Sequence, residues 1–368
     1  MDAKLKKIII YVSAGFIILL IIMFAISGCQ GKKANYDSYQ TKMEKAAKKY
    51  FESHEEELPT EDKKTSEYSL KKMIENGDID DYTKAFSDKN MKCEGSVTVT
   101  NNNGYYLYTS ELDCGDAYTS KTLAQQIKED NSTESGQGLY EIDDDYVFRG
   151  DSINNYATFA GEDWRIISID ENNNINLLQA KTKKRCVYDS HYNLEAGTSG
   201  INQYYQGEGK YSNLMTCLND YYTNQFSDEA KSYLSTQTVC YGARSKDDIT
   251  TDGSTECTQY IDKQPISLIS AYEYIRASID DGCISLDSRS CRNFNWLAKI
   301  DNTYFMTPST EKSNLVYSIT SMGIETTQST NFNAVLTKIS VNGDIKYLSG
   351  NGSKDNPYKI ADVAKKKK

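Results

Sequence analysis

The sequence contains few histidines and prolines, and it has no closely spaced cysteine pair. Its 368 residues include two histidines and four prolines. Two histidines exclude a multi-histidine metal centre and leave few imidazole bases for catalysis. The spacing Cys-x-x-Cys does not occur, so zinc-ribbon and thioredoxin-type sites have no support. Hydrophobic residues at 38% and charged residues at 26% exclude collagen, a polytopic membrane protein and a fully disordered chain. We expect no cofactor and no metal ion.

The N-terminal segment contains one long apolar stretch, at residues 8–26, interrupted only by Ser13, Ala14 and Gly15. At a rise of about 1.5 Å per residue, such a stretch approaches the thickness of the hydrocarbon core of a bilayer, about 30 Å. The apolar cores of signal peptides are shorter, about 7–15 residues. Lysines precede the stretch, so the positive-inside rule predicts a signal-anchor, a single transmembrane helix within residues 1–30.

A second interpretation of the same segment begins at Ile26-Ser27-Gly28-Cys29, which resembles a bacterial lipobox. Cys29 would then be diacylated and become the new N-terminus, and two acyl chains anchor a protein stably. Both alternatives stay open from the sequence. Both predict a protein at the bacterial cell membrane, with the bulk of the chain extracellular.

The other eight cysteines predict a disulfide framework, because an even number in an exported chain is typical of one. Asn103-Gly104 is a strong signal for a two-residue hairpin turn. The register that follows from this turn places Cys93 opposite Cys114, so we expect a disulfide between them. The other six cysteines allow fifteen pairings, of which sequence proximity favours Cys186–Cys217, Cys240–Cys257 and Cys283–Cys291.

The chain predicts two domains joined by a linker. Apolar residues at helical spacing predict a helix over 36–50 that ends before Pro59, and a second helix over 70–77 that stops at Gly77. With the Cys93–Cys114 hairpin they form a small α+β module at 31–127. The polar, glycine-containing segment 128–139 is the predicted linker.

The remainder, 140–362, predicts a larger and mostly β domain, followed by a basic tail at 363–368 that we expect to be solvated. The fold class expected for the whole chain is therefore α+β: a transmembrane helix, a small helix-helix-hairpin module and a disulfide-containing β-rich domain with a few helices. Predicted strands lie at 146–149, 156–159, 164–170, 175–180, 303–306, 315–320, 334–341 and 344–348, and predicted helices lie around 214–222 and 269–275.

Several stretches resemble bacterial surface proteins. The segment from Met43 to Pro59, the 70–77 helix and the hairpin ending at Cys114-Gly115 resemble the pilin-like module of single-pass surface proteins of low-GC Gram-positive bacteria. The segments 156–170, 266–274 and 351–360 are similar to a repeat-rich bacterial surface domain of undefined function, with C-type-lectin-like or sulfatase-modifying-factor-like folds. The resemblance implies surface display and no catalytic signature. The Gly-Phe-Thr-Leu-x-Glu processing site of type IV pilins is missing before the apolar stretch.

Motifs that suggest catalysis or metal binding have simpler explanations. Asp189, Ser190 and His191 are adjacent, whereas the members of a catalytic triad come from distant positions, so a surface histidine is favoured. His54 lies among glutamates near a helix end. The run from Asp170 to Asn174 starts like a calcium loop but lacks the required glycine and glutamate, so we predict a hairpin turn there. Asp143–Asp145 and Asp247–Asp248 are weaker calcium candidates.

Tyrosine is the residue in excess, with 29 copies. Tyrosines combine apolar rings with polar hydroxyls and suit glycan or protein recognition. The alternative is that tyrosines fill half-buried strands and that Trp164 and Trp296 belong to the core. The candidate binding aromatics are Tyr204, Tyr205, Tyr211, Tyr221 and Tyr222.

The net charge of −10 makes nucleic-acid binding unfavourable. The leading hypothesis is a membrane-anchored extracellular protein, not an enzyme, that binds a glycan, cell-wall or protein ligand or is displayed on the surface. One alternative is an envelope glycan hydrolase that uses carboxylates. The other is a structural subunit of a surface appendage.

Overall fold

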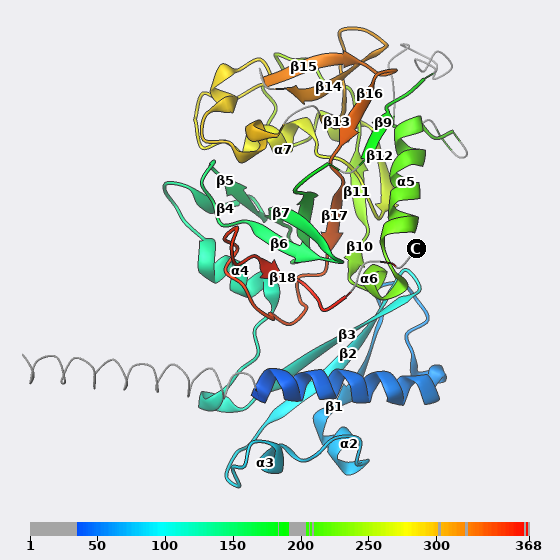
Figure 1. Cartoon of the computed structure of the whole chain (residues 1–368), viewed down its shortest axis with the longest axis vertical. Helices are drawn as coiled ribbons and strands as arrows, with labels where there is room; N and C mark the ends of the chain where they lie inside the picture. The colour runs from blue at the N-terminus through cyan, green and yellow to red at the C-terminus, as the bar shows by residue number, and fades with distance from the viewer. Residues whose placement is uncertain are drawn as a thin grey trace, which may run out of the picture. The chain divides into compact units, whose positions relative to one another are not determined.

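The computed structural model describes residues 35–363, apart from 183, 191–203, 206, 208–209, 301–302 and 321–322, together with residue 366. The chain forms two compact units (Figure 1). The smaller unit runs to Thr100 and includes Tyr108–Ser120, and the larger comprises Asn101–Leu107 and Lys121–Lys368.

A helix at residues 35–53 forms one side of the smaller unit (blue in Figure 1). It is helical because aromatic and apolar side chains recur every three or four residues, which gives one face to bury. Gln40 on this face donates from Nε2 to the backbone oxygen of Ser110 at 3.1 Å. The predicted first helix is therefore confirmed. Its buried side chains include Tyr36, Tyr39, Met43, Ala47 and Phe51.

The other side of this unit is a three-stranded sheet in the order β1-β2-β3, β1 and β2 pairing antiparallel. Asn103 and Gly104 both have positive φ, 55° and 83°, as the predicted two-residue turn requires. The disulfide Cys93–Cys114 closes the open end of this hairpin. The elements are η1 (Glu55–Glu57), β1 (Thr65–Ser69), α2 (Leu70–Glu75), α3 (Tyr82–Ala85), β2 (Glu94–Asn102), β3 (Tyr105–Asp113) and η2 (Gly115–Ala117).

The larger unit is built on an eight-stranded sheet whose main order is β10-β17-β8-β7-β5-β4, with β6 on β7 and β18 on β6. A five-stranded sheet has the order β15-β14-β13-β16-β9, and β11 pairs with β12 alone. The strands are β4 (Gly138–Ile142), β5 (Asp145–Arg149), β6 (Tyr156–Phe159), β7 (Glu162–Ile169), β8 (Ile175–Gln179), β9 (Lys184–Val187), β10 (Leu234–Ser235), β11 (Gln237–Cys240), β12 (Tyr260–Gln264), β13 (Thr303–Pro308), β14 (Leu315–Thr320), β15 (Gly323–Gln328), β16 (Phe332–Val335), β17 (Lys338–Val341) and β18 (Tyr358–Lys359).

Helices and disulfides complete the larger unit. Both tryptophans, Trp164 and Trp296, are buried in its core, as the second interpretation of the aromatics predicted. Three disulfides, Cys186–Cys217, Cys240–Cys257 and Cys283–Cys291, join the pairs that sequence proximity favoured. The helices are α4 (Leu123–Asn131), α5 (Asn213–Gln225), α6 (Asp228–Ser232), α7 (Ala271–Arg276), η3 (Glu256–Thr258), η4 (Arg289–Arg292) and η5 (Trp296–Lys299).

The predicted fold class needs one correction. The described part of the chain is α+β, mostly β, with seven α-helices and four disulfides. The prediction also included a transmembrane helix, whereas none of the helices in the described ranges is both long and apolar enough to cross a bilayer. Residues 8–26, for which that helix was predicted, and Cys29 lie outside the described residues.

The boundary between the units also differs from the predicted linker at 128–139. It falls between Ser120 and Lys121, before α4. Leu123, Ala124 and Ile127 of α4 are buried in the core of the larger unit. The polar residues of the predicted linker are therefore the solvent-facing side of a packed helix and the turn into β4.

The strand predicted at 344–348 does not form. The backbone N–H groups of Leu123 and Ala124 donate to the carbonyl oxygens of Ile345 and Gly343 at 2.8 and 2.9 Å. The first N–H groups of a helix have no partner within it, so this segment satisfies the start of α4 and does not extend the sheet.

We predict that a disulfide of the larger unit stabilises it more when it encloses a longer segment, in step with the logarithm of the enclosed length. Cys186–Cys217 spans 31 residues and Cys283–Cys291 spans 8. Loop-closure entropy then makes loss of the first cost about 1 kcal/mol more than loss of the second. Urea unfolding of the two Cys→Ser double variants measures the difference. A larger loss for the Cys283–Cys291 variant would contradict the prediction.

Candidate functional site

A polar cleft of about 340 Å³ opens on one face of the eight-stranded sheet. Its floor is a row of residues in register on four neighbouring strands: Val147 faces Ser168, Ser168 faces Asn176, and Asn176 faces Ser340. Asn176 donates from Nδ2 to Ser168 Oγ at 3.1 Å. Since alternate residues of a strand point to opposite faces, these strands bury apolar residues on one side and line the cleft on the other.

Three segments form the walls of the cleft. Helix α7 contributes an aromatic ring and two charged side chains, and the turn between β7 and β8 contributes a carboxylate and two amides. The segment joining β10 to β11, with the start of β11, contributes hydroxyls and one more amide. The wall residues are Tyr272, Glu273 and Arg276 of α7, Asp170, Asn172 and Asn174 of the turn, and Thr236, Gln237 and Thr238.

The first of two ion pairs in the cleft is tight and nearly buried. Glu273 Oε1 lies 2.7 Å from Lys338 Nζ, and the two side chains are 8% and 13% exposed. Glu273 Oε2 accepts from the backbone N–H and the hydroxyl of Ser270 at 2.7 and 2.9 Å. Both carboxylate oxygens of Glu273 are therefore engaged, and Lys338 is neutralised.

The second ion pair is looser. Asp145 Oδ2 lies 3.4 Å from Arg276 Nη1, longer than a normal charge-assisted hydrogen bond. Burial raises the pKa of the Asp145 carboxyl above its usual value, Arg276 opposes this rise, and the carboxylates of Asp170 and Glu273 add to it. Asp145 is thus a half-buried carboxyl whose negative charge is only partly balanced.

Asp170 holds the turn between β7 and β8. Its Oδ1 accepts from the backbone N–H groups of Asn172 and Asn174 at 3.0 and 2.8 Å. The predicted hairpin turn is therefore confirmed. In the part of the chain that the structure describes, no group of three or more His, Cys, Asp or Glu side chains is placed to hold a metal ion.

Two donors at the cleft are left without a partner. The Nε of Arg276 and the Nε2 of Gln237 are buried and make no hydrogen bond within the described residues. A buried donor without an acceptor costs about 1–3 kcal/mol. A ligand that brings acceptor oxygens would recover part of this cost.

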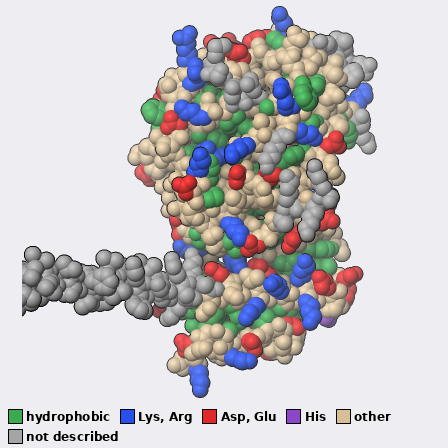
Figure 2. Space-filling view, viewed as in Figure 1, with side chains coloured by type: hydrophobic (Ala, Val, Ile, Leu, Met, Phe, Trp, Pro, Cys, Tyr) green, Lys and Arg blue, Asp and Glu red, His purple; other side chains and the backbone are tan. Residues whose placement is uncertain are grey.

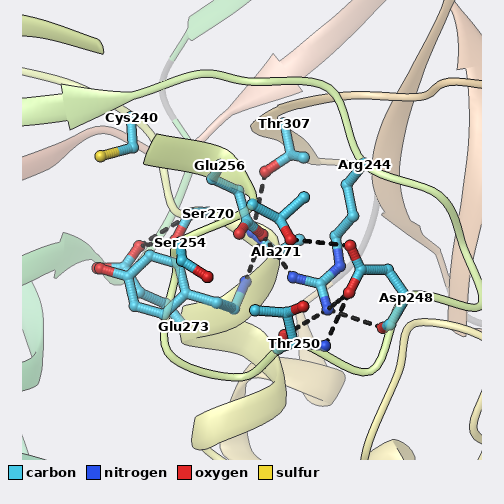
Figure 3. Close-up of polar contacts among 12 residues, drawn as sticks. Cys240, Arg244, Asp248, Thr250, Ser254, Glu256, Ser270, Ala271, Glu273 and Thr307 are labelled. Carbon is cyan, nitrogen blue, oxygen red and sulfur yellow. Dashed lines mark hydrogen bonds and ion pairs between the residues drawn. The ribbon is translucent and has the colours of Figure 1, made fainter. Parts of the chain in front are cut away.

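A buried network fixes the start of α7 (Figure 3). Arg244 and Glu256 are fully buried, and Arg244 Nη1 lies 3.0 Å from Glu256 Oε1. The same oxygen accepts from the backbone N–H of Tyr272 at 3.1 Å, and the N–H of Ala271 donates to Thr307 Oγ1 at 3.1 Å. The helix that carries one wall of the cleft therefore begins on a buried carboxylate.

The loop around Arg244 is closed by the same guanidinium. Its Nη2 donates to the backbone oxygens of Asp248 and Thr250 at 2.8 and 2.5 Å. The disulfide Cys240–Cys257 joins the two ends of this loop. Burial raises the pKa of Glu256, and Arg244 opposes that rise. The loop, the ion pair and α7 therefore form one connected structure.

The tyrosines proposed as binding aromatics do not share a surface. Tyr204 and Tyr221 belong to the core, with 0% and 9% of their surface exposed. Tyr222 also packs against the core, because α5 buries the face that carries it. Tyr205 and Tyr211 do stack, at 5.8 Å between ring centroids, and Tyr211 is 54% exposed. The five tyrosines therefore do not form one exposed surface, and a binding role for any of them stays a prediction.

Neither histidine is part of the cleft as described. His54 stacks on the ring of Tyr50 in the smaller unit, with ring centroids 4.1 Å apart. His191 lies outside the described residues. Asp189 is buried and Ser190 is exposed.

A second and more open hollow of about 360 Å³ is lined mainly by apolar and small residues, at positions 158–161 and at 359 and 361–363. Figure 2 shows acidic and basic side chains interspersed on the face drawn, with hydrophobic side chains among them. Each large exposed hydrophobic residue comes from a different segment of the larger unit, and single exposed hydrophobics are normal on protein surfaces. These residues are Tyr211, Ile249, Tyr260, Ile284, Phe294 and Phe332.

Sequence reasoning missed most of the cleft. No sequence pattern points to Glu273, Arg276 or Lys338 as site residues, and Asp145 belongs only to a weak calcium candidate. One signal is present: Ser168, Asn176 and Ser340 are polar residues that each stand between two apolar neighbours in their strand. Such residues mark the places where a sheet presents a polar face.

We predict that Glu256→Ala lowers the free energy of unfolding by about 3–5 kcal/mol, because it leaves Arg244 buried without its carboxylate. Urea unfolding of the full chain measures the loss. The control is Asp362→Ala, which breaks the exposed ion pair with Lys359 and should cost at most about 0.5 kcal/mol. Equal losses in the two variants would show that the buried ion pair contributes no more to the free energy of unfolding than the exposed one.

We also predict a measurable coupling between two carboxyls of the cleft. Because Asp170 raises the pKa of Asp145, the Asp170→Asn variant should lower it. Carboxyl ¹³C NMR titration of the Asp145 signal checks this. The pKa of Asp145 is higher in the folded than in the unfolded state. At a pH above the folded-state pKa, the ionised carboxyl therefore lowers the stability of the fold. This loss of stability disappears at a pH below the unfolded-state pKa of about 3.9. An unchanged titration midpoint in Asp170→Asn would refute the coupling.

Comparison with models of protein families, with curated proteins and with solved structures gives no match for this chain. The resemblance to pilin-like and lectin-like surface domains therefore stays a prediction. The chemistry of the cleft is the remaining guide to function.

Proposed function

We propose that the protein is exported and that the cleft on its eight-stranded sheet binds a glycan. The observation that carries this proposal is the floor and walls of the cleft, where amides, hydroxyls and carboxylates surround a space of about 340 Å³. This volume lies at the lower end of the range for small-molecule sites, about 300–1,000 Å³. The proposal makes the protein a binding protein of the cell surface.

The chemistry of the lining supports a carbohydrate ligand. Sugar hydroxyls both donate and accept hydrogen bonds, and the cleft offers both: carboxylate acceptors at Asp145 and Asp170, and amide groups at Asn172, Asn174 and Gln237. Tyr272 adds an aromatic ring with an apolar face to the same wall. An apolar ligand would leave these groups without partners, at a cost for each one.

The four disulfides support export. Disulfides form and persist in oxidising compartments and are rare in the cytosol. All eight cysteines of the described residues are joined in these bonds. We therefore propose the outside of a bacterial cell membrane as the location, with glycans of the wall or of another cell surface as ligands.

One observation favours a second function, hydrolysis of a glycan. Asp145 is a carboxyl with a raised pKa and lies near the carboxylate of Asp170. Glycosidases use two carboxyl groups whose environments differ in this way, one as acid and one as base or nucleophile. Release of reducing ends from a bound oligosaccharide would identify this activity.

A glycan-binding screen tests the proposal with two matched variants of the full chain. Thr238 lines the cleft and is exposed, so Thr238→Trp should fill the cleft mouth without disturbing the core. Thr251 is an exposed threonine outside the cleft lining, and Thr251→Trp is its control. We expect the unmodified chain and Thr251→Trp to bind the same glycans, and Thr238→Trp to bind them at least about tenfold more weakly, a change of about 1.4 kcal/mol.

Two results would contradict glycan binding in the cleft. One is a library of neutral, acidic and amino glycans of which none binds the unmodified chain. The other is binding that Thr238→Trp and Thr251→Trp weaken equally, because that would place the site elsewhere.

A further inference from the structure

We propose that the glycan bound in the cleft carries a protonated amine, which lies between Asp145 and Asp170. A polymer or oligomer that contains unacetylated glucosamine has this chemistry. The inference rests on the proposed glycan-binding function and names the class of its ligand. It follows from the balance of charge in the cleft and from the contacts of each charged group there.

The cleft lining contains three acidic and two basic side chains, Asp145, Asp170 and Glu273 against Arg276 and Lys338. Lys338 is matched by Glu273 at 2.7 Å, with both side chains nearly buried. This pair has no charge to offer a ligand. The remaining groups are two aspartates and one arginine, so one negative charge is in excess.

That excess lies at the end of the cleft formed by β5 and the turn between β7 and β8. Asp170 takes part in no ion pair with the described residues, and its hydrogen bonds come from neutral amides of its own turn. Asp145 has Arg276 at 3.4 Å, and that arginine also reaches the backbone oxygen of Ile142 at 3.4 Å. Neither aspartate has a close, dedicated cation.

The groups around the turn do not cancel this excess. Lys128 Nζ donates to Asn173 Oδ1 at 2.9 Å and lies over the ring of Tyr146 at 4.3 Å. Asp344 is beside the same lysine and the same turn, and it brings a further negative charge. Lys128 and Asp344 therefore balance each other, and neither lines the cleft.

A ligand ammonium group fits this arrangement better than a ligand carboxylate or sulfate. An added anion would face three carboxylates at short range, and each of the two cations already has an acidic partner. An ammonium offers three donors and one positive charge, which two carboxylates accept. The sugar hydroxyl oxygens would then be acceptors for the buried Nε of Arg276 and Nε2 of Gln237.

Calorimetry with two oligosaccharides tests the inference on the full chain. The probes are the hexamer of glucosamine and the hexamer of N-acetylglucosamine, which differ in the amine charge. At about pH 6 the amine of the glucosamine hexamer is protonated. We expect the glucosamine hexamer to bind at least about tenfold more tightly, and its affinity to fall at high salt, because salt screens charge pairs.

Substitutions of the two aspartates test where in the cleft the amine of the ligand binds. Asp145→Asn and Asp170→Asn keep the shape of each side chain and remove its charge, so each should weaken glucosamine binding about tenfold more than it weakens N-acetylglucosamine binding. Asp163→Asn is the control, since Asp163 is an exposed residue of β7 outside the cleft lining. It should leave both affinities unchanged. Two aspartate variants keep the test valid if one of them fails to fold.

The possible results separate the inference from the proposed function. If the acetylated hexamer binds equally well or more tightly, the proposed amine recognition is contradicted, while the proposed glycan binding is retained. Unchanged glucosamine affinity in both Asp145→Asn and Asp170→Asn also overturns it. If only acidic or neutral glycans bind, the proposed amine recognition is contradicted, and the proposed glycan binding in the cleft is retained. If no glycan binds, both proposals fail.

Discussion

The cleft depends on one buried ion pair. Arg244 and Glu256 are both fully buried, and the carboxylate that accepts from Arg244 also accepts from the first turn of α7. Removing two charges from water is expensive, and the attraction between them repays it only when the remaining hydrogen bonds are satisfied. Here backbone oxygens of the surrounding loop accept from the same guanidinium, whereas Arg244 Nε and Glu256 Oε2 make no hydrogen bond within the described residues, so the cost of burying the pair is repaid only in part. Position and stability of the cleft wall are thus coupled through one side-chain contact.

The opposite wall is positioned by simpler means. The backbone of the turn between β7 and β8 is held by Asp170 within the turn itself, and Lys128, Ser235 and Asp344 add side-chain hydrogen bonds from other segments. The cleft therefore joins a locally determined turn to a helix that depends on distant residues. Lys338 and Glu273, 65 residues apart in sequence, connect β17 to that helix.

Local patterns predicted local structure well. Helical spacing identified the helix at 35–53, and Asn103-Gly104 identified both the turn and the register that places Cys93 opposite Cys114. Predictions that needed tertiary information were weaker. The polar residues at the end of α4 predicted a linker, because the burial of Leu123 and Ile127 depends on contacts with residues far along the chain.

The cleft could not be predicted from the sequence for the same reason. Asp145, Asp170, Glu273 and Lys338 come from four separate segments, and nothing in their spacing brings them together. The tyrosines misled because a tyrosine serves equally well in a core and on a binding surface, and Tyr204 and Tyr221 are core residues. Charge at a site is a property of the folded arrangement, whereas composition reports only the whole chain.

Strand β17 has a consequence for the order in which the molecule forms. It begins at residue 338, yet it lies inside the eight-stranded sheet, next to the terminal strand β10 and between β10 and β8. A chain made from its N-terminus exposes the unpaired edge of β8 until more than 150 further residues have been synthesised, as the gap from residue 179 to 338 requires. Unpaired edges invite aggregation, and pairings this distant form slowly. A chaperone that shields the exposed strand during synthesis would therefore reduce aggregation more for this protein than for a protein whose sheet pairs only strands that are neighbours in sequence.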